Sequence, residues 1–227
     1  MKYTNIVKGI FESRPNRFIA RVYVDGKLET VHVKNTGRCK ELLVTNAEVL
    51  LEKSDNPNRK TKYDLVMVYK KGFGLINMDS QAPNKVVYEW LSKQGFSYIK
   101  PEFTYGDSRL DFYMERIDRH TGETVKYLME VKGCTLEVDG LGYFPDAPTE
   151  RGVKHLRELI KAVGEGYKAI VAFVIQMEGV YTVQANIQTH REFGEVLEEA
   201  KAAGVVVLPL CCRVSENSLD ITTKYEW

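Results

Sequence analysis

The chain of 227 residues is predicted to fold as two domains of different class, a small all-β domain followed by an α/β domain. Short strand patterns bounded by turn residues fill the first third of the chain, as in small barrels. Beyond it, strand and helix patterns alternate, which favours a sheet covered by helices on both faces. The charge changes sign at the same place: residues 1–83 hold 15 Lys and Arg and 9 Asp and Glu, a balance of +6, and residues 84–227 hold 17 and 22, a balance of −5.

Residues 1–83 are predicted to form an OB-like barrel. Asp25-Gly26 between two apolar runs is a strong signal for a tight hairpin. About two turns of helix are expected at residues 36–43. Strands are expected at residues 18–24, 30–33, 47–51, 65–69 and 74–77. Barrels of this type are often used to bind oligonucleotides.

The basic residues of this first domain gather in its loops. Arg14-Pro15-Asn16-Arg17 and Lys34-Asn35-Thr36-Gly37-Arg38 place cationic groups beside residues that can donate hydrogen bonds to phosphate. The same residue types are also ordinary turn formers, so both interpretations stay open. The candidate nucleic-acid-binding residues are Arg14, Arg17, Lys34, Asn35 and Arg38.

Residues 84–227 are predicted to form the α/β domain, after a linker at residues 80–84. Its first helix ends before Gly95, and a strand at residues 99–104 leads into a hairpin. Thr149 is a good N-cap for the next helix, where Arg151 and Lys154 could meet a phosphate at the helix N-terminus or form a solvated basic face. Further elements are a strand at residues 169–175, a helix that starts with the capping pattern Thr189-His190-Arg191-Glu192, and a strand at residues 205–210.

The hairpin at residues 109–132 holds the residues with the clearest chemistry. If Thr121-Gly122 is its two-residue loop, Asp111 lies opposite Lys132, and Glu130 shares their face. Neighbouring carboxylates repel each other unless a cation lies between them, and carboxylate oxygens suit Mg²⁺. An edge hairpin with a solvated charged face is the alternative interpretation. The side chains expected to point into the core instead are Leu110, Phe112, Met114, Met129 and Val131.

Cysteine and histidine spacing argues against the common zinc sites and disulfide frameworks. The four cysteines include no C-x-x-C pair and are interpreted as free thiols, and the four histidines are scattered. No apolar run approaches the roughly 18 residues of a membrane helix, and the N-terminus lacks the apolar segment of a secretory signal. We therefore expect a cytoplasmic protein without a membrane partner, of undetermined oligomeric state.

Several segments of this sequence resemble the sugar fermentation stimulation protein (SfsA) family. The most specific of them is the nine-residue segment Phe144-Pro145-Asp146-Ala147-Pro148-Thr149-Glu150-Arg151-Gly152. The chain differs from the family pattern at Lys34, where proline is usual, and at Cys39, where methionine is usual. The other matching segments are Arg14–Phe18, His32–Arg38, Ser54–Pro57, Gly106–Phe112 and Glu130–Lys132.

The resemblance implies an N-terminal OB-like domain and a C-terminal domain like those of the PD-(D/E)xK nucleases. It implies that Asp111 and Glu130, helped by the Val131 carbonyl, hold Mg²⁺ or Mn²⁺. Lys132 would orient the attacking water or stabilise the charge of the transition state. The expected partner is DNA, with single-stranded DNA and RNA left open.

Two other hypotheses remain open at this point. A non-enzymatic, largely non-specific DNA-binding regulator linked to sugar (maltose) metabolism genes would keep the basic loops and use the carboxylates for structure or for a non-catalytic ion. A protein that binds a sugar or a nucleotide through the loop at residues 32–38 would bind a small ligand independently of DNA.

Overall fold

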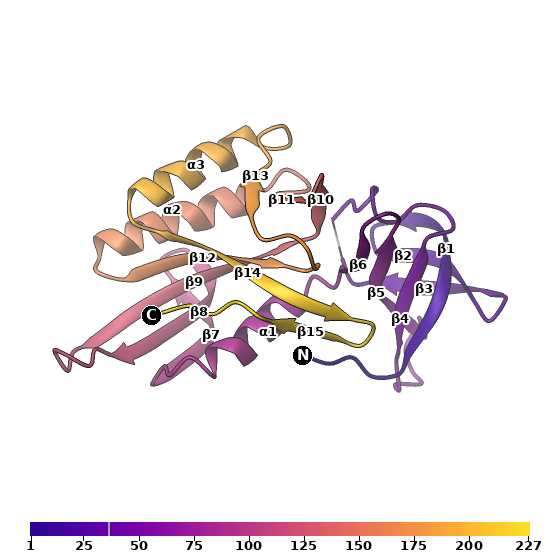
Figure 1. Cartoon of the computed structure of the whole chain (residues 1–227), viewed down its shortest axis with the longest axis horizontal. Helices are drawn as coiled ribbons and strands as arrows, with labels where there is room; N and C mark the ends of the chain where they lie inside the picture. The colour runs from indigo at the N-terminus through magenta and orange to yellow at the C-terminus, as the bar shows by residue number, and fades with distance from the viewer. Residues whose placement is uncertain (36) are drawn as a thin grey trace.

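The computed structural model of the protein describes residues 1–35 and 37–227, and it consists of two domains that lie side by side (Figure 1). The first domain is a barrel. Its strands lie in the order β3-β2-β1-β4-β5-β6, and a parallel pairing of β3 with β5 closes a ring of five strands. The strands are β1 (Ile6–Asn16), β2 (Ile19–Val24), β3 (Lys27–Val33), β4 (Glu48–Lys53), β5 (Tyr63–Lys70) and β6 (Gly74–Asn77). The predicted OB-like barrel is confirmed.

Local signals explain most of the barrel. The tight turn between β2 and β3 is confirmed, with left-handed backbone at Asp25 (φ 50°) and Gly26 (φ 76°). Strand β1 was not predicted, because Gly9 interrupts the alternation of its sequence. Its pairing with β2 is also irregular after Phe11. The β-carbon of any larger residue at position 9 would lie 2.5 Å from Cγ1 of Val22, so glycine lets two strands approach closely.

The helix predicted at residues 36–43 is wrong for residues 37–43, which form turns; Thr36 lies outside the described residues. Cys39 has a φ of 44°, a left-handed conformation that no helix continues through. Its carbonyl accepts hydrogen bonds from the N–H groups of Leu42 and Leu43. Cys39, Leu42 and Leu43 are buried, so their apolar spacing indicated burial in the barrel and not a helix.

The second domain is built on a six-stranded mixed sheet in the order β15-β14-β12-β9-β8-β7. Helices α2 (Glu150–Gly164) and α3 (Arg191–Ala202) cover one face, and α1 (Ala82–Leu91) lies on the other (Figure 1). The sheet strands are β7 (Tyr98–Tyr105), β8 (Ser108–Ile117), β9 (Thr124–Cys134), β12 (Lys168–Ile175), β14 (Val206–Ser215) and β15 (Ser218–Ile221). A small second sheet, not predicted, consists of β10 (Leu136–Val138), β11 (Leu141–Phe144) and β13 (Val183–Ala185).

The predicted α/β layers are confirmed, with corrections at the ends of elements. The linker predicted at residues 80–84 is too long, because Ala82, Pro83 and Asn84 already form the first turn of α1, where proline is well tolerated. The domain boundary placed between residues 83 and 84 stays a prediction. Thr149 caps α2 by accepting from the Gly152 N–H, as predicted. Helix α3 begins after His190, one residue later than the capping pattern indicated.

A buried polar network joins the two domains. The Gln176 amide donates to Oδ1 of Asn77 at 2.9 Å and to the Asp79 carbonyl at 3.1 Å, and all three residues are at most 1% exposed. At the other end of the interface, the ammonium of Lys70 pairs with the buried carboxylate of Glu137. Buried polar groups that satisfy one another in this way fix the relative placement of the parts they join. The two domains are therefore held in a fixed position relative to each other.

No helix in the described part of the chain is long and apolar enough to cross a membrane.

Candidate active site

The hairpin of β8 and β9 has a longer loop than the sequence predicted. The strands pair from Ile117 opposite Thr124 to Phe112 opposite Met129, so six residues, not two, form the loop. The carboxylate of Asp118 accepts hydrogen bonds from the N–H groups of the next turn, which stabilises this wider loop. The predicted register is therefore wrong by two residues.

A shift of two residues does not by itself change the face on which a paired side chain lies. The pairing stops at Phe112 opposite Met129. Just beyond it, Asp111 accepts a hydrogen bond from the Val131 N–H, next to Glu130, so the two carboxylates lie close together. Both faces of the sheet are covered, and the predicted core residues divide between them. Phe112, Met114, Met129 and Val131 pack with α1, whereas Leu110 packs on the α2 side, so the single shared core face predicted for all five is wrong.

Asp111 lies where β8 separates from β9. Its Oδ2 accepts a hydrogen bond from the Val131 N–H at 2.7 Å, and its Oδ1 accepts one from the side-chain amide of Asn84 at 2.7 Å. Burial, and then the nearby charge of Glu130, raise the pKa of Asp111 to about 6. The sequence did not single out Asn84, whose position at the start of α1 becomes relevant only when the helix packs on the sheet.

Glu130 is 3% exposed and uses only one of its two carboxylate oxygens. Oε1 accepts from Nζ of Lys132 at 2.6 Å and from Nδ1 of His155. Oε2 is buried and has no hydrogen-bond partner among the described residues. Burial raises the pKa of Glu130, but the hydrogen bonds and charges of His155 and Lys132 outweigh burial and hold that pKa below its usual value.

His155 is a site residue that the sequence analysis missed. It is 4% exposed on the inner face of α2, one turn before the buried Leu159. Nε of Arg151 donates to its Nε2 at 3.3 Å, and its Nδ1 forms a hydrogen bond with Oε1 of Glu130. Its place within the apolar stripe of α2 was the available signal, since a polar residue on a buried helix face needs a partner.

The arrangement fits a divalent cation. Asp111 and Glu130 supply hard oxygen donors, and the unpartnered Oε2 of Glu130 is a buried group that a cation would satisfy. In an extended strand the N–H and C=O of one residue point to the same edge. The Val131 carbonyl therefore points to the side of β9 on which its N–H meets Asp111.

Three of the five predicted nucleic-acid-binding residues of the first domain build the loop that precedes the cleft. The two terminal nitrogens of Arg14 donate to the carbonyls of Arg17, Asn35, Gly37 and Arg38 at 2.7–2.9 Å. Asn35 donates to the Met78 carbonyl and accepts from the Gly37 N–H. Lys34 pairs with the fully buried Asp79 at 2.9 Å. These contacts hold the loop in place.

The other predicted basic residues are exposed. Among the described residues, the side chains of Arg17 and Arg38 make no hydrogen bond or ion pair, so they are available to a ligand. On α2, Lys154 reaches the Asp107 carbonyl at 2.9 Å, and Arg151 contacts His155. Basic groups therefore lie on the barrel and on α2.

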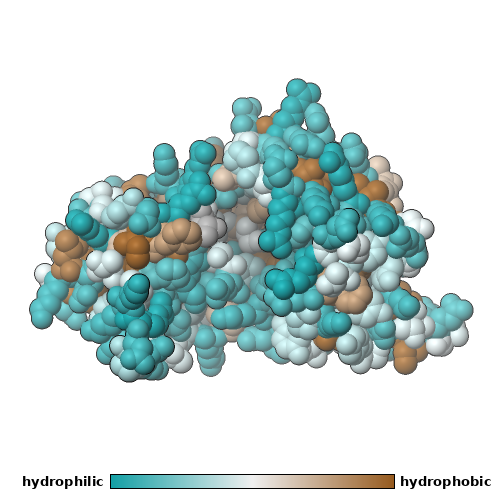
Figure 2. Space-filling model, turned by 180° about the vertical axis from the view of Figure 1, so that it is seen from behind, coloured by the Kyte–Doolittle hydropathy of each residue, from teal (hydrophilic) through white to brown (hydrophobic). Residues whose placement is uncertain are grey.

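A cleft of about 330 Å³ lies between the domains, and Figure 2 shows the molecule hollowed there. Its walls come from the barrel loops, from the start of α1 and from the segment that leads into α2. Pro83 and Gly133 line it, and each is the chain neighbour of a site residue, Asn84 or Lys132. A second cavity of about 340 Å³ on the barrel shares Arg17 with the cleft and adds Arg38 and Lys40.

Comparison with known proteins identifies both domains. Residues 13–78 match the family model described as the SfsA N-terminal OB domain, and residues 81–218 match the model described as the sugar fermentation stimulation protein RE domain. The sugar fermentation stimulation protein homologue of Desulfitobacterium hafniense is 55% identical over 223 residues, which is 97% of this chain and 95% of the relative. The homologue of Clostridium beijerinckii is 55% identical over 225 residues, with 97% and 96% covered.

A solved structure is similar along the whole chain. The structure of Pyrococcus furiosus SfsA in complex with Ca²⁺ superposes with a TM-score of 0.82 at 26% sequence identity, and it covers 98% of this chain and 95% of its own.

Proposed function

Because the chain belongs to the sugar fermentation stimulation protein family, we propose that it is a DNA-binding protein that cleaves phosphodiester bonds with a divalent metal ion held by Asp111 and Glu130. The observation that carries the proposal is the buried Oε2 of Glu130, which has no partner in residues 1–35 and 37–227 and lies beside a second carboxylate. A protein that only bound DNA would gain nothing from two converging carboxylates, which repel each other and the phosphate backbone.

The metal, Mg²⁺ or Mn²⁺, supplies Lewis acidity and a bound water more acidic than bulk water. The protein's own residues would hold the two carboxylates in position and balance their charge. Asp111 is fixed by Asn84 and by the Val131 N–H, and Glu130 is fixed by His155. Hydrogen bonds to the ligating groups from residues around them are the usual way in which proteins tune a metal site.

Lys132 is the residue placed to act on the reacting phosphate. Its ammonium is 2.6 Å from Glu130, so it sits at the edge of the carboxylate pair and is 13% exposed. An ammonium there can orient the attacking water and stabilise the negative charge that develops on the phosphate oxygens. The resemblance of the hairpin to the Asp…Glu-x-Lys pattern of PD-(D/E)xK nucleases supports the same assignment.

Basic groups on the two domains would hold the nucleic-acid backbone. Arg17 and Arg38 lie on the barrel, and Arg151 and Lys154 lie on α2. Arginine and lysine contacts to phosphate supply sequence-independent affinity that weakens as salt is added. The Ca²⁺ named for the Pyrococcus furiosus protein also supports a divalent cation here, since Ca²⁺ takes oxygen ligands of the type that Asp111 and Glu130 offer.

The test is incubation of the purified protein with labelled DNA and RNA, single-stranded and duplex, with Mg²⁺, Mn²⁺ or chelator. We expect metal-dependent cleavage that Asp111→Asn abolishes and that Lys132→Ala lowers about 100-fold or more. Lys161→Ala is the matched control, since Lys161 is an exposed lysine on α2. Intact substrate under every condition, together with salt-sensitive binding, would instead identify a non-enzymatic DNA-binding regulator.

A further inference from the structure

The interdomain cleft has the size and position of a ligand site next to the carboxylates. Its volume of about 330 Å³ is at the lower end of the range for ligand pockets, about 300–1,000 Å³. Its lining residues Pro83 and Gly133 directly adjoin Asn84 and Lys132 in the chain. A group bound in the cleft would therefore contact the chain neighbours of two residues of the proposed cleavage site.

Two polar oxygens in the cleft wall make no hydrogen bond to any described residue. Thr135 is 8% exposed, and its hydroxyl makes no hydrogen bond within the described parts of the chain. Gln176 is 1% exposed; its amide nitrogen is used by Asn77 and Asp79, whereas Oε1 accepts no hydrogen bond from a described residue. Both residues line the cleft, so their oxygens are available to form hydrogen bonds with a polar ligand there.

Gly133 keeps the Gln176 oxygen accessible. A β-carbon at position 133 would lie 2.4 Å from Oε1 of Gln176 and 2.9 Å from Cγ of Pro83. Any larger residue would therefore cover this acceptor and narrow the cleft between the two lining residues. Since Gly133 is in β9 with ordinary strand pairing, a turn does not explain the glycine.

Aromatic side chains form another wall. Phe144 is fixed by ring contacts with Phe173 at 5.5 Å and Phe193 at 5.2 Å. Tyr143 precedes it in β11 and is half-buried at the cleft. A flat aromatic ligand could stack on such side chains, as unpaired bases do in proteins that bind single strands.

The two cavities differ in charge, so each would accept a different part of a nucleotide. The barrel cavity contains Arg17, Arg38 and Lys40 and suits phosphate. The cleft contains one cation, Arg17, and one carboxylate, Asp146, so their charges balance, and the carboxylate would accept hydrogen bonds from amino groups. With Oε1 of Gln176 as a second acceptor, the cleft favours a neutral ligand that carries amino groups.

We propose that the cleft binds one unpaired nucleobase beside the cleavage site, so that the protein recognises single-stranded nucleic acid and prefers bases with an exocyclic amino group. This inference rests on the nucleic-acid binding of the proposed function and names its substrate class. A duplex would first have to unpair and extrude a base, which costs free energy that a single strand does not spend. Adenine, cytosine and guanine carry the amino group, and thymine and uracil do not.

The test measures equilibrium binding by fluorescence anisotropy in chelator, so that no cleavage occurs. The probes are short single strands of adenine, cytosine or thymine nucleotides, the matching adenine–thymine duplex, an abasic strand of equal length, and the RNA counterparts. We expect the adenine and cytosine strands to bind about tenfold or more tightly than the duplex and the abasic strand, as expected for base stacking. The thymine strand should bind at an intermediate level.

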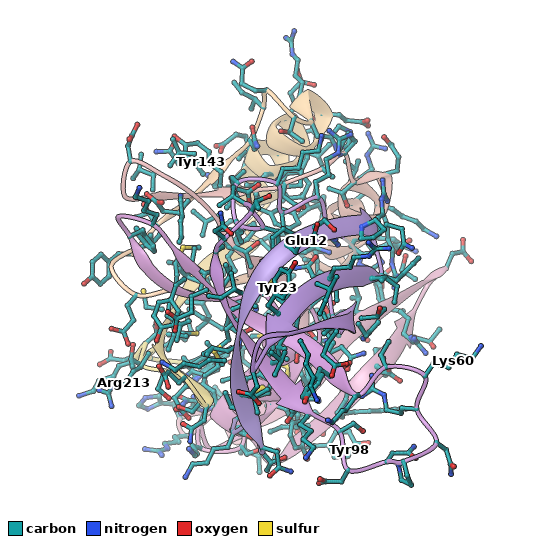
Figure 3. All side chains as sticks on the ribbon, turned by 90° about the vertical axis from the view of Figure 1, so that its right-hand side faces the viewer. Glu12, Tyr23, Lys60, Tyr98, Tyr143 and Arg213 are labelled. Atoms are coloured by element: carbon teal, nitrogen blue, oxygen red, sulfur yellow. The ribbon has the colours of Figure 1, made fainter. Side chains whose placement is uncertain are left out.

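Variants of cleft residues test whether the base-dependent binding takes place in the cleft. Tyr143→Leu is expected to weaken binding of the adenine strand about fivefold or more without changing the abasic strand. Thr135→Val keeps the size of the side chain and should narrow the difference between adenine and thymine strands. Tyr98→Leu is the matched control, because Tyr98 is 48% exposed and lies far from Tyr143 (Figure 3).

The outcomes separate this inference from the proposed function. Equal affinities for single strand, abasic strand and duplex, or no response to Tyr143→Leu, would overturn the base site even if metal-dependent cleavage is observed. Base-dependent binding without cleavage would retain the base site and remove the nuclease. Tight binding of a mononucleotide or a sugar that DNA does not displace would refute both proposals.

Discussion

Replacing Asp111 by asparagine is expected to stabilise the metal-free protein and to abolish the proposed cleavage. In the absence of a cation, the ionised Asp111 is buried next to the ionised Glu130, and both circumstances raise its pKa from 3.8 to about 6. An acid whose pKa is raised on folding destabilises the folded state at every pH above that pKa, because the folded protein releases the proton less readily than the unfolded chain. Asparagine removes the charge and keeps the shape.

The magnitude follows from the shift. Each pKa unit corresponds to about 1.4 kcal/mol, so the ionised carboxylate costs the folded protein on the order of 3 kcal/mol near neutral pH. The asparagine Oδ1 can still accept from the Val131 N–H, but its amide nitrogen then meets the amide of Asn84, a loss of about 1 kcal/mol. The net gain is about 2 kcal/mol, or about 4–8 °C in Tm for a chain of this size.

The assay is urea unfolding in chelator across pH, with Asp25→Asn in the exposed β2–β3 turn as the control. The advantage of Asp111→Asn should be full above about pH 7 and disappear as the pH falls below 3.8, where the wild-type carboxyl is protonated in both states. A variant less stable than wild type at neutral pH, or a gain in stability that does not vary with pH, would show that burial and the charge of Glu130 do not destabilise the ionised Asp111.

Three further outcomes are expected. Arg14→Lys should lower the free energy of unfolding in urea by about 2 kcal/mol or more, since lysine cannot bind four carbonyls at once. Arg17→Ala should lower it by less than about 0.5 kcal/mol and should weaken DNA binding, measured by fluorescence anisotropy. Lys34→Met removes the ammonium that pairs with the buried Asp79 and should lower the free energy of unfolding in urea by about 3 kcal/mol. Mg²⁺ or Mn²⁺ at ten times its Kd should stabilise the wild type by about 1.4 kcal/mol in thermal unfolding and leave Glu130→Gln unchanged; an equal shift in both would place the ion elsewhere.

The candidate carboxylate pair could be predicted because strand alternation has a period of two. An error of two residues in the β8–β9 register therefore did not affect the expectation that Asp111 and Glu130 lie close together. The contribution of His155 could not be predicted in this way. It reaches Glu130 from α2, 25 residues further along the chain, and no local pattern reports which strand a helix will cover.

The basic loops show the limit of composition as evidence. The sequence identified Arg14, Lys34 and Asn35 as candidate ligands for phosphate, and the fold places them in hydrogen bonds and an ion pair that build the loop. An arginine that binds phosphate and an arginine that holds a loop in place look the same in the sequence. Only the positions of the surrounding carbonyls show whether its donors are already used.

The sequence alone therefore determined the class of each domain, the strands and helices with clear periodicity, and the proximity of Asp111 and Glu130 on adjacent strands, because all of these depend on neighbours in the chain or across one hairpin. The tertiary structure decided which oxygen of Glu130 lacks a partner, which cations are already paired, and where the two domains enclose a cleft. Those properties depend on contacts between residues far apart in sequence, and burial fixes them only when helices, barrel and sheet have packed together.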